Sequence, residues 1–247
     1  IRSGECVAVS DGSFKNAFGT AAFILQGKNE KGEIRSASVI PGDSEDQSAY
    51  RSELGGIYGI VTMIQAVCEY YNISEGQAEI GCDGERALRQ CFKGGNAAPT
   101  AAQFDLISAI RATISKVPIR WKGRWVRGHQ DDYFGPLDRW ASLNVDMDAT
   151  AKVLWAKAVE SKPDMNPRVS GEPWPLFIEG IKICRELHGR IIRHICGTKC
   201  KEYWDKKGRF SEEGSAKDVD WEATTEAMKS IQGTRRKWVT KHVSGFC

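Results

Sequence analysis

The chain of 247 residues is predicted to be an α/β protein, in which helices cover a sheet that contains parallel strands. Three segments predict this class. An apolar run over residues 6–10 ends at Asp11, a second strand-like run over 79–82 ends at Asp83, and an amphipathic helix is expected between them. A strand, a helix and a second strand in this order are typical of α/β proteins.

The two strand ends are expected to meet. Side chains alternate along a strand, so Val7, Val9 and Asp11 share one face, as Gly81 and Asp83 do on the second strand. If the strands are parallel neighbours, both carboxylates lie beyond their carboxyl ends, where open α/β sheets bind ligands.

The helix between the strands carries an acidic residue at the edge of its apolar stripe. Glu53 lies four residues before Ile57, on the side that should face the sheet. A buried carboxylate needs a partner or a metal ion. The stripe consists of Leu54, Ile57, Val61, Ile64, Cys68 and Tyr71.

Two later segments add to this set. His129 follows Gly128 after a third strand-like run, and Asp148 lies at the start of a last helix. Asp146 competes with Asp148, but residues two apart on a helix point to nearly opposite faces, so only one can enter a shared site. Four carboxylates and one imidazole are the groups that two-metal phosphodiester cleavage requires. Singly, an Asp-Gly pair after a strand is ordinary turn chemistry, and Asp131, Asp132 and Asp138 are assigned to a solvated loop.

The sequence resembles ribonuclease H of type I. The matching segments lie in the family's order within about residues 5–155 and are 9–13, 50–54, 82–84, 125–129 and 144–152. The segments 48–54 and 137–141 look like the ribonuclease H region of retroelement polyproteins. The resemblance implies a five-stranded mixed sheet flanked by helices.

The resemblance also implies hydrolysis of the RNA strand of RNA–DNA hybrids with two Mg²⁺ ions, for which Mn²⁺ is a possible substitute. Asp11, Glu53, Asp83 and Asp148 would hold the metal ions, and His129 would handle protons or help the product leave. The family's spacing of four between an Asn and the last Asp, here Asn144 and Asp148, favours Asp148 over Asp146.

Discrimination of RNA from DNA depends on contacts to the 2′-hydroxyl group. Family members often have Asn or Gln before the helix Glu and a Gln after the second Asp, where this chain has Ala49, Tyr50 and Glu85. Specificity for the hybrid is therefore less well defined than metal-dependent cleavage. The expected nucleic-acid contacts in the first part of the chain are Asn16, Tyr50, Arg51 and Glu85.

Charge is distributed unevenly along the chain. Residues 1–152 contain 17 Lys and Arg against 19 Asp and Glu, a net charge of −2, whereas residues 153–247 contain 18 against 13, a net charge of +5. A neutral loop over 94–99 stands where some relatives have a basic protrusion, and a helix is expected near 101–116. Phosphate contacts are therefore expected from the tail, where Arg235, Arg236 and Lys237 adjoin Trp238.

Three regions are predicted. Residues 1–160 form the ribonuclease H-like catalytic domain, 161–175 a Pro-rich linker and 176–247 a basic, mainly helical extension. Four of the eight prolines fall at 163, 167, 173 and 175, which is typical of a linker. The extension should contain a hairpin near 176–183 and helices near 185–206, 220–231 and 234–243.

Eight cysteines without a short regular framework predict reduced thiols and an intracellular protein of the cytoplasm or nucleus, neither secreted nor membrane-bound. Buried thiols and surface imidazoles explain the Cys and His residues of the tail more simply than zinc, because their spacing fits no usual zinc module. These residues are Cys184, His188, His194, Cys196 and Cys200. The eight tryptophans, including Trp121 and Trp125 on a strand near 120–125, are assigned to the core.

The expected partners are an RNA–DNA hybrid and the polymerase part of the same polyprotein. One alternative is a nuclease of the same fold that cuts double-stranded RNA or DNA, since the usual 2′-hydroxyl readers are missing. Another is a catalytically silent nucleic-acid-binding or scaffold domain, against which the complete carboxylate set argues.

Overall fold

The structure is a computed structural model that describes residues 1–27, 32–132, 135–161, 169–170, 172, 175–208 and 219–244. The chain divides into two compact units, Ile1–His188 (unit 1) and Gly189–Cys247 (unit 2). Most of the predicted Pro-rich linker, with Pro163, Pro167 and Pro173, lies outside the described residues.

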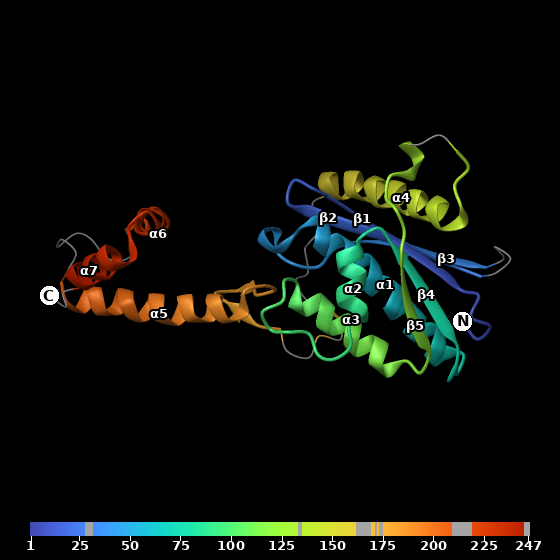
Figure 1. The fold of residues 1–247 in the computed structure, drawn as a ribbon, viewed down its shortest axis with the longest axis horizontal. Coiled ribbons are helices and arrows are strands. Elements are labelled where there is room, and N and C mark those ends of the chain that lie inside the picture. Colours follow the sequence, from blue (N-terminus) through green and yellow to red (C-terminus); the bar gives the residue numbers. More distant parts are fainter. Residues whose placement is uncertain are drawn as a thin grey trace. The chain divides into compact units, whose positions relative to one another are not determined.

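Unit 1 is built on a five-stranded sheet with the strand order β3-β2-β1-β4-β5 (Figure 1). The strands β1, β2 and β3 pair antiparallel, whereas β4 runs parallel to both β1 and β5. The sheet is therefore mixed, and the predicted parallel pairing of the two strands that carry Asp11 and Asp83 is confirmed. The strands are β1 Val7–Lys15, β2 Phe18–Gln26, β3 Glu33–Val39, β4 Gln77–Cys82 and β5 Arg120–Trp125.

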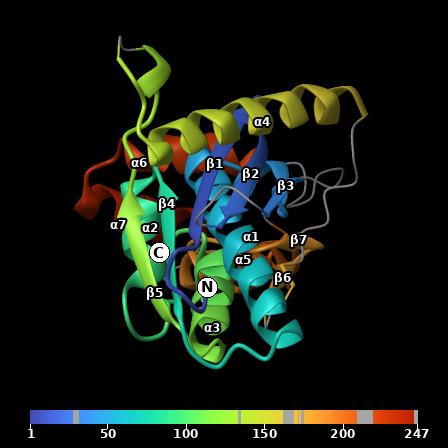
Figure 2. The ribbon, with the colours of Figure 1, turned by 90° about the vertical axis from the view of Figure 1, so that its right-hand side faces the viewer.

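Helices cover both faces of this sheet (Figure 2). The alternation of side chains along β1 decides which residues meet which helix, because Ala8 packs with the core of α1 and α3 while Val7 and Val9 pack against Met147 and Ala151 of α4. The predicted α/β class, a five-stranded mixed sheet flanked by helices, is confirmed. The helices of unit 1 are α1 Ala49–Tyr70, α2 Glu85–Phe92, α3 Phe104–Lys116 and α4 Arg139–Ser161, with short 3-10 turns at Ser44–Asp46 and Gln130–Asp132.

Helix α1 lies unusually close to the sheet. Its apolar stripe is fully buried at Leu54, Ile57 and Ile64, as the sequence periodicity predicts. Gly56 permits the close approach, since a Cβ atom at this position would lie 2.7 Å from the Cβ atom of Ser10. The first turn of α1 is thereby held directly over β1.

The core of unit 1 is mainly aliphatic, and the assignment of the tryptophans to the core is confirmed only in part. Trp140 packs against the buried cluster that includes Val9 and Met147. Trp121 is partly buried against the core, but 57% of Trp125 is exposed. The reason is the position of β5 at the edge of the sheet, where the neighbouring strand and helices cover little of a large side chain.

A short hairpin follows in unit 1, with strands β6 Phe177–Ile178 and β7 Ile181–Lys182. The sequence predicted this hairpin but assigned it to the extension that starts at residue 176. The boundary between the compact units instead follows His188. The physical reason is that Lys182 and Cys184 are fully buried inside unit 1.

Unit 2 is helical. Helix α5 (Leu187–Lys206) begins at the end of unit 1, and α6 (Trp221–Lys229) and α7 (Gly233–Ser244) follow it, close to the three predicted ranges. Asp220 caps α6 as predicted, because its Oδ1 accepts a hydrogen bond of 2.8 Å from the main-chain N–H of Ala223. Among the described helices, none has the length and apolar character needed to cross a membrane.

Candidate functional site

The pairing register of the sheet brings Asp11 and Asp83 together. Strand β1 pairs with β4 up to Val9 and Gly81, and each aspartate follows two positions later on the same face of its strand. Beyond this point β1 continues along β2 alone, with Asp11 opposite Ala22. The two carboxylates therefore lie where β1 and β4 separate, as the sequence predicted.

Glu53 enters from the first turns of α1. Ser48 caps this helix by accepting a hydrogen bond of 3.1 Å from the main-chain N–H of Arg51. Gly12 allows β1 to touch the helix, because a Cβ atom there would lie 2.6 Å from the main-chain carbon of Ser52. The Glu53 carboxylate accepts a hydrogen bond of 3.0 Å from the thiol of Cys82.

Helix α4 decides between the two competing aspartates. Asp148 lines the cleft with Asp11, Glu53 and Asp83, whereas Asp146 forms an ion pair of 2.5 Å with Arg35 of β3. The two residues are two positions apart and point to different sides, as expected for a helix. The structure thus places Asp148, the residue favoured by sequence, in the cleft.

Two further α4 side chains support the carboxylates. Asn144 is buried, and its Nδ2 donates a hydrogen bond of 3.2 Å to Oδ2 of Asp11. Lys152 lies 2.6 Å from Oδ2 of Asp148, one helical turn away. Lys152 occurs in a segment that the sequence singled out, but the sequence did not indicate that its ammonium group enters the cleft.

The loop after β5 completes the rim. His129 is exposed, has a left-handed backbone with φ of 52°, and lines the cleft. Gly128 passes so close to the second aspartate that a Cβ atom would lie 2.6 Å from Oδ2 of Asp83. Asp131 also lines the cleft, although the sequence assigned it to a solvated loop. Asp138 instead caps α4, accepting a hydrogen bond of 2.8 Å from Ala141 N–H.

The cleft has a volume of about 300 Å³ and collects side chains from β1, α1, α4 and the loops after β4 and β5. All five residues predicted to form one site are therefore brought together. The lining consists of Asp11, Gly12, Ser13, Phe14, Ala49, Glu53, Asp83, His129, Asp131, Asn144, Val145, Asp148 and Lys152.

Negative charge in the cleft is poorly compensated. Burial, followed by the charge of Asp83, raises the pKa of Asp11 to about 8. Burial, followed by the charges of Asp83 and Asp11, raises the pKa of Glu53 well above its ordinary value. Burial also raises the pKa of Asp83, although the hydrogen bond with Glu53 and then the nearby His129 oppose this. Raised carboxylate pKa values mean that the ionised cleft favours added cations.

The chemistry of the donors fits a hard divalent cation. Glu53, Cys82 and Asp83 place one potential ligand atom each within 4.8 Å of one another. The Cys82 thiol is fully buried, and burial raises its pKa well above the ordinary value, so it remains protonated and is a poor ligand. The carboxylate oxygens that remain, including those of Asp11 and Asp148, are the ligands that Mg²⁺ prefers.

The prediction that Arg51 contacts nucleic acid is wrong. Its side chain is fully buried in an ion pair of 2.8 Å with Asp105 of α3, and it cannot reach a ligand at the surface. Arg51 and Glu53 are two positions apart on α1, so Arg51 points to nearly the opposite side of the helix from the cleft that Glu53 enters.

The other expected contacts remain open to solvent to different extents. Tyr50 is half-buried, and the guanidinium of Arg86 lies 4.7 Å from the centre of its ring. Glu85 is exposed in the first turn of α2. Asn16 is exposed at the tip of the β1–β2 hairpin, five positions beyond Asp11, or roughly 17 Å along the strand. Tyr50 and Glu85 are therefore better placed than Asn16 to contact a substrate held at the carboxylates.

Trp125, which the sequence assigned to the core, is exposed beside the main chain of Asp83. Its indole Nε1 donates a hydrogen bond of 3.0 Å to the main-chain oxygen of Asp83. An alternating strand pattern cannot reveal such an exposed aromatic residue, because it does not show which strand lies at the edge.

The tail residues that were predicted to contact nucleic acid lie on α7 in unit 2. Arg235, Arg236 and Lys237 are exposed on α7, and 60% of Trp238 is exposed. The Arg236 guanidinium donates hydrogen bonds of 3.0 Å to the main-chain oxygens of Lys229 and Ile231. Their role in nucleic-acid binding stays a prediction.

The sequence explained the cysteines of the tail as buried free thiols rather than zinc ligands, and their burial confirms this for Cys184 but not for Cys196 and Cys200. Cys184 is buried in unit 1, where its Sγ donates to Oδ2 of Asp105 over 3.3 Å, whereas Cys196 and Cys200 are exposed on α5. The cysteine and histidine residues of the tail form no potential metal-binding group within the described residues.

No protein-family profile and no curated protein matches the chain. Similar solved structures include LC11 ribonuclease H1 in complex with an RNA/DNA hybrid, with 11% identity over 62% of this chain and 99% of that chain and a TM-score of 0.47. Another structure of LC11 ribonuclease H1, which was isolated from compost by a metagenomic approach, shows 12% identity over 63% of this chain and 99% of that chain, with a TM-score of 0.44. The N-terminal ribonuclease H domain of a Mycobacterium tuberculosis protein, solved as a fusion with maltose-binding protein, shows 18% identity over 62% of this chain and 99% of that chain, with a TM-score of 0.34.

Proposed function

We propose that unit 1 is a metal-dependent endonuclease that hydrolyses the RNA strand of RNA–DNA hybrids. One observation carries this proposal. Asp11, Glu53, Asp83 and Asp148 come from separate elements, converge in one cleft, and are not matched there by an equal number of cationic side chains. Such a set of oxygen donors suits two Mg²⁺ ions, with Mn²⁺ as a substitute.

The carboxylates would hold the metal ions, and their neighbours would fix the carboxylates. When bound, the two cations supply Lewis-acid stabilisation of the reacting phosphate and activation of water. Asn144 fixes the orientation of Asp11 by its hydrogen bond, and Lys152 does the same for Asp148. Cys82 donates a hydrogen bond to Oε2 of Glu53 and helps to fix the orientation of that carboxylate.

His129 would move a proton. It is exposed on a loop at the rim, so its imidazole can exchange protons with solvent and meet the attacking water or the leaving oxygen. Since it is not a ligand in this scheme, its loss should reduce the rate by less than loss of a carboxylate. General acid–base catalysis typically contributes about 10²–10⁴-fold, and we expect the loss of His129 to lie at the lower end, about 10²-fold.

The substrate part of the proposal is tested by direct comparison of duplexes. Labelled RNA–DNA hybrid, double-stranded RNA and double-stranded DNA of one sequence are incubated with the protein and Mg²⁺ or Mn²⁺, alongside Asp83→Asn. Hybrid-only cleavage that Asp83→Asn abolishes is the expected result. If no duplex is cut while the hybrid is bound tightly in Mg²⁺, the domain is a binding module and the proposal is lost.

A nuclease of the same fold with another substrate is the second candidate. Arg51, one of the expected hybrid contacts, is buried, and the half-buried Tyr50 already packs with Arg86. Fewer side chains than expected are thus free to read a 2′-hydroxyl group. Cleavage of double-stranded RNA or DNA in the same experiment would keep the metal site and change the substrate.

The origin in a retroelement and the polymerase partner remain proposals that rest on the sequence resemblance alone. Co-purification of the full chain with the polymerase segment of the same polyprotein would test the partner.

A further inference from the structure

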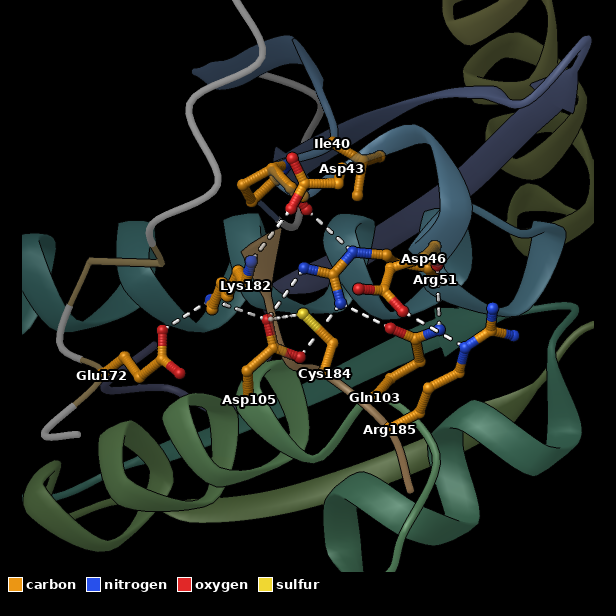
Figure 3. Close-up of polar contacts among 12 residues, drawn as sticks. Ile40, Asp43, Asp46, Arg51, Gln103, Asp105, Glu172, Lys182, Cys184 and Arg185 are labelled. Atoms are coloured by element: carbon orange, nitrogen blue, oxygen red, sulfur yellow. Dashed lines mark hydrogen bonds and ion pairs between the residues drawn. The ribbon is translucent and has the colours of Figure 1, made fainter. Parts of the chain in front are cut away.

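A second cluster of charged groups, centred on Asp105, involves Arg51 of the N-terminal turn of α1 (Figure 3). Arg51 and Glu53 are two residues apart, so their side chains point to nearly opposite sides of the helix. Glu53 enters the cleft, whereas Arg51 points towards α3 and forms hydrogen bonds of 2.9 and 2.8 Å with the two carboxylate oxygens of Asp105. The Nε of Arg51 also donates to the main-chain oxygen of Pro41 over 2.7 Å.

The hairpin β6–β7 supplies a second cation to this cluster. Lys182 is fully buried, and its Nζ lies 2.9 Å from Oδ2 of Asp105 and 2.6 Å from Oε2 of Glu172. The main-chain N–H of Lys182 donates to Oδ2 of Asp43 over 3.2 Å. Figure 3 shows that Lys182 and Arg51 approach Asp105 from different elements.

The chain that follows the hairpin is also held in place by hydrogen bonds and an ion pair. The main-chain oxygen of Cys184 accepts a hydrogen bond of 3.1 Å from the first residue of α3, Phe104. Arg185 lies 3.2 Å from Oδ1 of the buried Asp46 and donates to the main-chain oxygen of Glu45 over 2.8 Å. Asp46 and Glu45 belong to the short turn just before α1. Residues 176–185, called the clasp below, therefore hold both α3 and the chain that leads into α1.

Charge in this cluster is balanced. Burial alone would raise the pKa of Asp105, but the hydrogen bonds and charges of Arg51 and Lys182 outweigh burial and hold that pKa below its ordinary value. Such a network is strongly destabilised when one partner is removed, because a buried charge is left without compensation. The clasp is therefore part of the structure that fixes α1.

We propose that the clasp positions Glu53. Lys182 and Arg185 act as positioning residues that hold the turn before α1 and the first turn of the helix, so that the Glu53 carboxylate keeps its place in the cleft. The inference rests on the proposed function in one respect, namely that Glu53 binds a metal ion. Neither positioning residue touches the substrate or the metal ions.

The test uses the full chain with Arg185→Ala, Lys182→Met and a control in the same hairpin, Ile181→Ala. The Ile181 side chain is 41% exposed and is not part of the charge cluster. Amide hydrogen exchange is measured for residues 51–53 of the metal-free protein, and Mn²⁺ binding is measured by calorimetry without nucleic acid. Hydrogen exchange shows whether the start of α1 is loosened, and Mn²⁺ binding shows whether the carboxylates of the cleft are displaced.

We expect Arg185→Ala and Lys182→Met to speed exchange at residues 51–53 and to weaken Mn²⁺ binding by about 10-fold, the lower end of what loss of a ligand-orienting contact does. Ile181→Ala should leave both unchanged. Because Lys182→Met removes a fully buried charge, it is the variant at risk of not folding, and Arg185→Ala then carries the test, since Arg185 is 44% exposed.

Faster exchange confined to the hairpin, with unaltered Mn²⁺ binding, would show that the clasp is only a local fastening and would overturn the proposal. The proposed function has its own separate failure. If the wild-type chain cuts no duplex, or binds no Mn²⁺, that function is lost, and exchange at residues 51–53 still decides whether the clasp holds α1.

Discussion

The two charge clusters on either side of the first turns of α1 differ in their balance of charge. In the cleft, Asp11, Glu53, Asp83 and Asp148 gather with Lys152 as their close cation, and the pKa of Asp11 is raised to about 8 by burial and by Asp83. In the Asp105 cluster, the two buried cations Arg51 and Lys182 meet two carboxylates, Asp105 and Glu172, and the pKa of Asp105 is lowered. The comparison teaches that buried charge alone does not mark a functional site. The imbalance of charge does, because an unbalanced cluster is completed by a ligand and a balanced one is complete within the protein.

The largest effect should come from removing a carboxylate of the cleft. Asp148→Asn should lower cleavage by about 10³-fold, because loss of several kcal/mol of metal-derived stabilisation corresponds to about one decade per 1.36 kcal/mol. Asp146→Asn is the matched control, since it lies on the same helix but pairs with Arg35 outside the cleft. Steady-state cleavage rates of both variants decide the matter, and equal rates would remove Asp148 from the site.

Substitutions in the Asp105 cluster should lower the free energy of unfolding. Arg51→Met leaves Asp105 with one of its two cations and should lower the free energy of unfolding by about 3–5 kcal/mol. Arg35→Met, which breaks the exposed pair with Asp146, should lower it by no more than about 1 kcal/mol. Urea titrations followed by circular dichroism measure both. Similar losses for the two variants would mean that burial does not distinguish the pairs.

Divalent cations should stabilise the cleft and leave the balanced cluster unaffected. Mg²⁺ at about 100 times its dissociation constant should raise the free energy of unfolding by about 2.7 kcal/mol. In Asp83→Asn this gain should shrink strongly, whereas the metal-free variant should be slightly more stable than the wild type because a repulsive charge is gone. Thermal unfolding with and without Mg²⁺ tests this, and an undiminished gain in the variant would place the cation elsewhere.

The last expected effect is a dependence of the free energy of unfolding on pH. The pKa of Asp11 is raised from 3.8 to about 8, so the folded, metal-free protein binds a proton that the unfolded chain has lost between these values. Stability should therefore fall as pH rises from about 4 to about 8, by up to about 1.4 kcal/mol per pH unit from one group. Saturating Mg²⁺ should flatten this slope. Unfolding free energies at pH 5, 6, 7 and 8 provide the check, and a rising metal-free curve would contradict the prediction.

The sequence predicted most of the cleft because its information is local. Strand alternation places Asp11 and Asp83, and the apolar stripe of α1 places Glu53, each from neighbours within a few residues. Helical geometry also shows that only one of Asp146 and Asp148 can enter the cleft, but the choice of Asp148 came from the family resemblance, through the spacing from Asn144. The first three predictions need the secondary structure and little else.

The balanced cluster could not be predicted in the same way. Arg51 meets Asp105 and shares it with Lys182, whose sequence positions are far apart, and no local pattern links them. For the same reason the sequence placed the hairpin in the extension and Arg51 at the substrate. The exposure of Trp125 depends on which strand lies at the sheet edge, and that is also a property of the assembled sheet.

Gly12 has a consequence for the evolution of such chains. A side chain at this position would collide with the main chain of Ser52, so the separation of Asp11 from Glu53 is a backbone dimension that repacking of side chains cannot alter. A related chain that lost its carboxylates but kept Gly12 would keep the spacing between β1 and α1. A chain that lost Gly12 would lose this spacing even if every acidic residue were still present. Residue 12 therefore marks the backbone geometry of the cleft, whereas the acids mark its chemistry.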